Sequence, residues 1–126
     1  MPLTGENLRA SSLYITLNSR PKKGEYHWGL LITDSSTKGT LHHANNGSGG
    51  WKYEARAVDP AKSMTLIALV FVASISDPVS VEAVIRSIPT GTASRRTGEA
   101  FTCRIWVKDV LVALQEAGLI LLPEDI

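Results

Sequence analysis

The sequence predicts a single α+β domain over residues 1–126, with a mostly antiparallel sheet of about five strands and one or two packed helices. Short runs rich in β-branched and aromatic residues fill roughly the first 75 positions, which is typical of strands. The last third instead repeats apolar residues at intervals of three and four, as amphipathic helices do. With 44% hydrophobic residues the chain can bury a core, and its single cysteine excludes an intrachain disulfide.

Four short runs bounded by turn-forming residues are predicted strands, at 12–17, 25–33, 39–44 and 51–58. The run 64–75 is almost continuously apolar, which predicts a central strand buried on both faces of the sheet. It is too short for a bilayer, which requires about 20 apolar residues, so we expect no membrane span.

Two helices are expected after the strands. Asp77 is a suitable N-cap, and Pro78 fits the first turn of the helix that follows. The strongest helical periodicity covers residues 101–117, with Thr102 as the N-cap and Gly118 just past the end.

The charge pattern narrows the classes of partner. Thirteen Lys and Arg residues against twelve Asp and Glu residues give a net charge of +1, without a broad basic surface for phosphate backbones. We therefore expect no nucleic-acid partner. Residues 1–7 lack the pattern of a secretory signal, and a free thiol suits a reducing compartment, so the chain is expected to be cytoplasmic. The sequence does not specify an oligomeric state.

The only thiol, Cys103, falls in the first turn of the second predicted helix. Unpaired backbone N–H groups and the positive end of the helix dipole favour a thiolate there. The neighbouring Arg104 is a candidate for holding an acidic group of a substrate. A lone cysteine on an apolar helix face is equally consistent with a small core residue.

The three histidines lie on two consecutive predicted strands. His27 shares a strand face with Gly29, whose missing side chain lets a helix or ligand approach closely. Alternation places one of His42 and His43 on the face of His27 and the other on the opposite face. A thiol-protease arrangement follows, with Cys103 as nucleophile, His27 as base, His42 orienting the base, and amides around Cys103 as oxyanion donors.

The runs YHWGLLI at 26–32, GTLHHA at 39–44 and FTCRIWV at 101–107 resemble the permuted papain-like cysteine enzymes. This superfamily includes lecithin retinol acyltransferase-like enzymes and, more distantly, NlpC-type peptidases. Small fungal proteins have a similar pattern. The resemblance implies a permuted papain-like fold in which His27 is the base, Cys103 the nucleophile and His42 the third polar residue. His43 is the third polar residue instead if the pairing of the two strands is shifted by one residue.

By the same resemblance, we expect a hydrolase or acyltransferase that acts on an amide, ester or thioester and needs neither cofactor nor metal. The substrate is a small molecule, a peptide or a protein, with Trp28, His43 and Arg104 as the expected substrate-binding residues. Acyltransferases of this kind have Glu-His-Phe after the cysteine, where this chain has Arg-Ile-Trp, and they carry a hydrophobic membrane anchor that this sequence lacks. Lipid acyl transfer is therefore not implied.

Two other hypotheses fit the sequence. The chain is alternatively a non-catalytic interaction module that retains the papain-like fold and presents aromatic residues such as Trp51 and Tyr53 to a protein partner. A zinc site built from Cys103, His27 and one of the adjacent histidines lacks the paired ligand spacing of known zinc sites, so we expect no metal.

Overall fold

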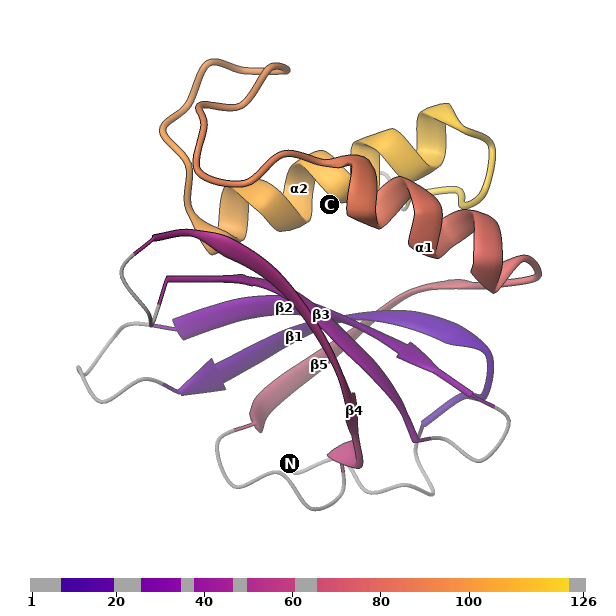
Figure 1. The fold of residues 1–126 in the computed structure, drawn as a ribbon. Helices are drawn as coiled ribbons and strands as arrows, with labels where there is room; N and C mark the ends of the chain where they lie inside the picture. Colours follow the sequence, from indigo (N-terminus) through magenta and orange to yellow (C-terminus); the bar gives the residue numbers. More distant parts are fainter. Residues whose placement is uncertain (1–7, 20–25, 35–37, 47–49, 61–65, 123–126) are drawn as a thin grey trace.

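The chain forms two layers, a five-stranded antiparallel sheet and a pair of helices that cover one of its faces (Figure 1). This arrangement confirms the α+β class predicted from the sequence. The computed structural model describes residues 8–19, 26–34, 38–46, 50–60 and 66–122, and the counts above refer to those residues.

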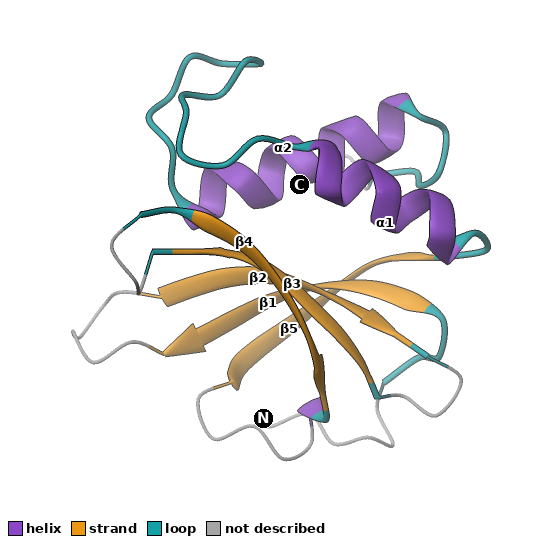
Figure 2. Cartoon of the chain, in the orientation of Figure 1, coloured by secondary structure: helices purple, strands orange, loops and turns teal. Residues whose placement is uncertain are grey.

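The first four strands follow one another in the sequence and lie side by side in the sheet (Figure 2). Four neighbouring strands form an antiparallel meander, and the fifth returns to the free edge of the first, giving the order β4-β3-β2-β1-β5. The strands are β1 (Ser12–Ser19), β2 (Tyr26–Thr33), β3 (Gly39–Asn45), β4 (Lys52–Val58) and β5 (Leu66–Ser74). The four short predicted strands are confirmed, with ends that differ by two residues or fewer.

The last strand corrects one expectation, since the run 64–75 was predicted to be central. Residues 64 and 65 lie outside the described residues, and β5 is an edge strand that pairs with β1. Its hydrophobicity has another cause, because both faces of the sheet are packed at this edge. Val72 joins the core beneath the helices, while Phe71 packs on Tyr14 across the opposite face. Val70 nevertheless remains 44% exposed.

Both helices begin at the predicted caps. Helix α1 (Pro78–Ser87) is capped by the Asp77 carboxylate and α2 (Cys103–Glu116) by the Thr102 hydroxyl. Each cap accepts the backbone N–H of the third residue after it, at 3.1 Å, which satisfies one of the free amides of the first turn. Neither helix of the described chain is long and apolar enough to cross a membrane.

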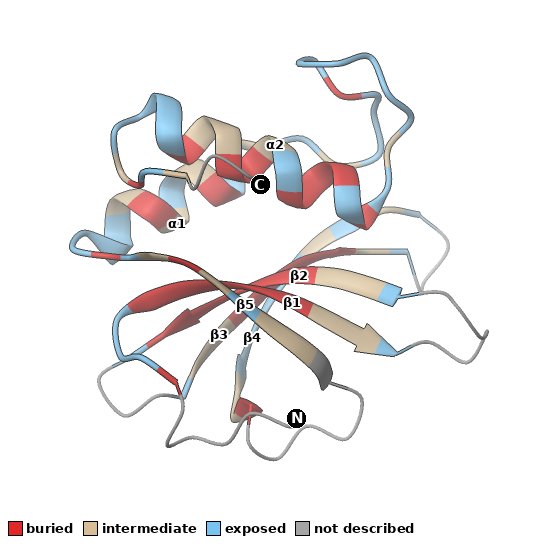
Figure 3. Cartoon of the chain, turned by 180° about the vertical axis from the view of Figure 1, so that it is seen from behind, coloured by how far each residue is buried: buried red, intermediate tan, exposed pale blue. Residues whose placement is uncertain are grey.

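The main core lies between the helices and the sheet. Buried positions, red in Figure 3, concentrate where α1 and α2 face the strands. Trp106 of α2 is the largest fully buried side chain and is surrounded by Leu30, Ile85 and other apolar residues. This packing fixes α2 on the sheet and thereby determines where its first residue, Cys103, lies.

Side chains alternate between two sheet faces, which we name by what covers them. The helix face carries Leu30, Ile32 and Ala44, which belong to the core beneath α1 and α2. The outer face carries the residues between them, such as Leu31, which packs with Tyr14 in a separate cluster. The two adjacent histidines of β3 therefore point to different faces.

Candidate active site

Cys103 lies against the start of β2. Its Sγ atom is 3.5 Å from the backbone nitrogen of Trp28, which donates to the sulfur. The β2–β3 ladder extends only as far as the pair Leu30–His42, so Trp28 lies beyond its last recorded pair. Because Trp28 directly follows His27, the structure brings the only cysteine to the backbone next to the predicted base, while the His27 side chain itself points to the outer face.

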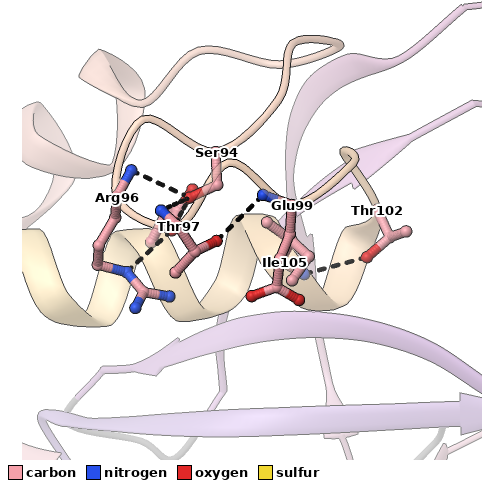
Figure 4. Close-up of polar contacts among 7 residues, drawn as sticks. Ser94, Arg96, Thr97, Glu99, Thr102 and Ile105 are labelled. Carbon is pink, nitrogen blue, oxygen red and sulfur yellow. Dashed lines mark hydrogen bonds and ion pairs between the residues drawn. The ribbon is translucent and has the colours of Figure 1, made fainter.

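The approach to this helix is held by a network of hydrogen bonds (Figure 4). The Ser94 hydroxyl accepts the backbone N–H groups of Arg96 and Thr97, and it donates to Asp109 of α2 at 2.9 Å. The Arg96 guanidinium also pairs with Asp109, at 3.2 Å. These contacts attach the loop to α2 just before Thr102 caps it, so Arg96 has a structural role.

Three polar side chains from neighbouring strands form a hydrogen-bonded row on the outer face. His27 Nε2 of β2 is 2.6 Å from His43 Nδ1 of β3, and His43 Nε2 is 3.0 Å from Glu54 Oε1 of β4. Glu54 lies directly opposite His43 in the ladder of β3 and β4. The hydrogen bond from His43 lowers the pKa of the Glu54 carboxyl, so at neutral pH this residue is an acceptor.

The direction of these bonds can be assigned from the donors and acceptors available. A Glu54 carboxylate requires the proton of His43 to be on Nε2, which leaves Nδ1 of a neutral His43 as an acceptor. His27 must then donate from its own Nε2, and in a neutral ring Nδ1 is the nitrogen without a proton. The row therefore fixes the tautomer of a neutral His27.

His42 does not belong to this row, which corrects its expected role beside His27. It points to the helix face, is 0% exposed, and its Nδ1 lies 2.7 Å from the hydroxyl of Tyr53. Its Nε2 lies 4.0 Å from a Glu82 oxygen on α1. Burial lowers the pKa of His42 and keeps the ring neutral. The register differs from the expected one by a residue, and His43 occupies the third position.

The predicted substrate-binding residues are distributed differently from the expectation. Trp28 is half-buried and packs its ring against the helix-side core, so its backbone is the part that contacts Cys103. Arg104 is exposed on the first turn of α2. His43 uses both of its ring nitrogens in the row with His27 and Glu54. Arg104 is thus the member of this set whose charged group faces solvent.

Two aromatic residues expected to be exposed are packed instead. Trp51 is half-buried and meets the ring of Phe101 edge-on, at 5.0 Å between centroids. Tyr53 is half-buried, stacks on His42 and contacts the main core. The prediction that these two side chains form an exposed aromatic surface for a partner is therefore wrong.

No metal-binding group is formed by the part of the chain that the structure describes. Within those residues, no three or more His, Cys, Asp or Glu side chains are arranged to hold an ion. The histidine row instead satisfies its nitrogens by hydrogen bonds.

Comparison with known proteins gives one match. Residues 11–124 match the model of a family described as "Family of unknown function (DUF6914)". The chain belongs to this family. No curated protein and no solved structure matched it. The matched region includes Cys103 and the whole histidine row.

Glu54 was not identified from the sequence, although it completes the row. It belongs to a strand, KYEARAV, whose alternating charges are typical of a solvated edge. Its relation to His43 depends on the register between β3 and β4, which pairs Asn45 with Lys52 and therefore His43 with Glu54. The length of the connection between β3 and β4 could have indicated this pairing, because a short hairpin connection constrains the register of its two strands.

Proposed function

We propose that this protein is a cysteine-dependent hydrolase or acyltransferase that attacks an amide, ester or thioester carbonyl through Cys103. The observation that carries the proposal is the row Glu54–His43–His27, which ends beside the backbone position that contacts the cysteine sulfur. Together, Cys103 and this row supply a nucleophile, a base and groups that orient the base.

The chemistry follows from the assigned tautomers. The Cys103 thiol gives its proton to the imidazole of His27, and the sulfur forms a bond to the carbonyl carbon of the substrate. The bond from that carbon to nitrogen, oxygen or sulfur then breaks, and the leaving group takes the proton back from His27. Water or another nucleophile repeats the sequence on the thioester, which releases the acyl group and restores the thiol.

The first turn of α2 supplies candidate oxyanion donors. Helix geometry leaves the amides of Cys103 and Arg104 without intrahelical acceptors, whereas the Ile105 amide is used by the Thr102 cap. An oxygen that becomes negative as the sulfur attacks would lie next to these two N–H groups and the positive end of the helix dipole.

The order of the residues along the chain supports the same proposal. A histidine at the start of a strand, a second histidine on the next strand and a cysteine that begins a late helix resemble the permuted papain-like enzymes. We accordingly propose a permuted papain-like fold, a cytoplasmic location, and a small-molecule, peptide or protein substrate rather than a nucleic acid.

A second candidate is an interaction module that keeps this fold without turnover. The burial of Cys103, which is only 7% exposed, favours this alternative, because a sulfur within the core reacts slowly. The two candidates differ in whether the sulfur accepts an acyl group in the folded protein.

Intact mass spectrometry tests the proposal. The protein is incubated with p-nitrophenyl acetate and an acetyl thioester, and the mass of one acetyl group is sought on Cys103. We expect this adduct in the wild-type protein and its loss in Cys103→Ala and His27→Ala. Acetylation that appears only after the protein is unfolded would instead support the interaction module.

A further inference from the structure

A small hollow lies on the outer face of the sheet, on the same face as His27 and His43. Its walls are mostly apolar and come from Leu31, Leu41, Val58 and Leu69, with Thr16 and Arg56 among its polar lining residues. We propose that this hollow binds a small aliphatic side chain next to a free carboxylate, as at the C-terminal alanine of a peptide or in an N-acyl-alanine. The idea that this ligand is a substrate rests on the proposed function, whereas the binding of the ligand to the hollow does not.

The hollow and the histidine row belong to one continuous surface. Leu41 and His43 are two residues apart on β3, which corresponds to about 7 Å along the strand. Arg56 and Glu54 are separated in the same way on β4 and point to the same face. A ligand that fills the hollow therefore has its next atoms beside the proposed base.

Gly29 lets two residues that line the hollow pack closely over β2. It lies on this strand between His27 and Leu31, and a Cβ atom at this position would be 2.9 Å from Thr16 Oγ1 and 3.1 Å from Leu41 Cδ1. Any side chain here would displace the Thr16 hydroxyl and the end of Leu41, which already occupy this space. The glycine thus allows these two residues to lie next to the row.

The Thr16 hydroxyl is an independent sign of a polar ligand. Thr16 is 3% exposed, lines the hollow, and its Oγ1 has no hydrogen-bond partner within the described structure. Buried polar groups are nearly always paired, and an exception calls for an explanation. A carboxylate oxygen or amide group of a ligand that reaches this buried atom by moving the neighbouring end of Leu41 would provide the missing partner.

Charge and size define the ligand further. Arg56 is exposed and lines the hollow, and its planar guanidinium suits a carboxylate. The acidic side chain on this part of the face, Glu54, is hydrogen-bonded to His43, and the charge of Arg56 helps to lower its pKa. The hollow has a volume of about 50 Å³, which corresponds to about four water-sized groups. Because the α-carbon and carboxylate of the ligand take up part of this space, alanine fits, whereas leucine, which has three more carbons, or a lipid chain does not.

An NMR titration with N-acetyl-alanine tests the binding without requiring catalysis. It uses full-length protein with Cys103→Ser, and the backbone amides of Thr16 and Gly29 are followed. We expect saturable shifts of both amides, and an affinity at least about tenfold weaker for N-acetyl-alanine methylamide and for N-acetyl-leucine. Equal affinity for the acid and the amide, or no shift at millimolar ligand, would overturn the proposal.

Variants separate recognition from folding. Arg56→Gln is expected to weaken binding of N-acetyl-alanine at least about tenfold, while Lys52→Gln, a basic residue on the same strand, leaves it unchanged. Thr16→Val keeps the shape of the side chain and is expected to weaken binding as well, so the test stands even if Gly29→Ala does not fold. Unchanged affinity in both Arg56→Gln and Thr16→Val contradicts the site.

The outcomes also distinguish this inference from the proposed function. Specific binding by Cys103→Ser together with no acetylation of wild-type Cys103 would leave the subsite standing and remove the enzyme. Acetylation of Cys103 without binding of N-acetyl-alanine would keep the enzyme and reject this class of substrate.

Discussion

His42 and His43 are neighbours in the sequence and belong to different parts of the molecule. His42 faces the helices, is fully buried and hydrogen-bonds the Tyr53 hydroxyl. His43 faces outward and links His27 to Glu54, a side chain that is 46% exposed. The comparison shows that the two faces of this sheet have separate tasks. The helix face supports the fold, and the outer face carries the hydrogen-bonded row for which we propose a role in proton transfer.

The largest difference between the faces is expected in stability. His42→Ala should lower the free energy of unfolding by about 2–4 kcal/mol, because it creates a cavity and leaves the Tyr53 hydroxyl without its partner. His43→Ala should cost less, about 1–2 kcal/mol, because its partner Glu54 reaches water even though His43 itself is only 5% exposed. Urea denaturation measures both values. Equal losses would show that the outer row is as structural as the buried histidine.

The partners of the two histidines provide a second comparison. Tyr53→Phe removes the hydroxyl and leaves Nδ1 of His42 buried without a partner, so we expect a loss of about 1–2 kcal/mol. Glu54→Gln keeps a group that can accept a hydrogen bond at an exposed site and should change stability by less than about 0.5 kcal/mol. The same urea denaturation measures the loss of stability in both variants. A larger loss in Glu54→Gln than in Tyr53→Phe would show that the outer face, and not the helix face, supports the fold.

The sequence was sufficient to predict the strands and helices but not how they are placed relative to one another. Caps such as Asp77 and Thr102 act through the next few residues, so both helix starts could be predicted locally. The choice between His42 and His43 depends on how β2, β3 and the helices meet, and a shift of one residue exchanges the faces. The edge position of β5 was missed for a similar reason, because hydrophobicity reports how many faces are packed and not how many strands are adjacent.

The two N-caps form a matched pair for the next prediction. Thr102→Ala and Asp77→Ala should each lower the free energy of unfolding, the first by about 1 kcal/mol, because each removes an acceptor for a first-turn amide. Only Thr102→Ala should also slow alkylation of Cys103, which directly follows this cap. Urea denaturation and the rate of iodoacetamide labelling of the folded protein measure the two effects. Equal slowing in Asp77→Ala would indicate a general loss of structure.

The smallest expected effect is a pH dependence of stability that comes from His42. Burial lowers the pKa of this ring in the folded protein, so the unfolded chain binds a proton more readily below pH 6.5. Its contribution to stability is therefore complete above pH 6.5 and is lost as the pH falls toward the folded pKa. His42→Gln should have a flatter stability curve between about pH 7 and 5. The Glu54 carboxyl has a lowered pKa and affects only the range below its ordinary value of 4.5, so it does not interfere.

The most direct test of the account is the rate at which iodoacetamide alkylates Cys103 in the folded protein as a function of pH. The comparison includes His27→Ala and the matched variants His43→Gln and His42→Gln. A working row predicts that the folded wild-type protein is still labelled at about pH 6.5, because the base assists removal of the thiol proton. It also predicts at least about a tenfold loss in His27→Ala and a smaller loss in His43→Gln, with little change in His42→Gln. Labelling that follows an ordinary thiol in every variant, or that requires unfolding, would contradict a catalytic role for Cys103.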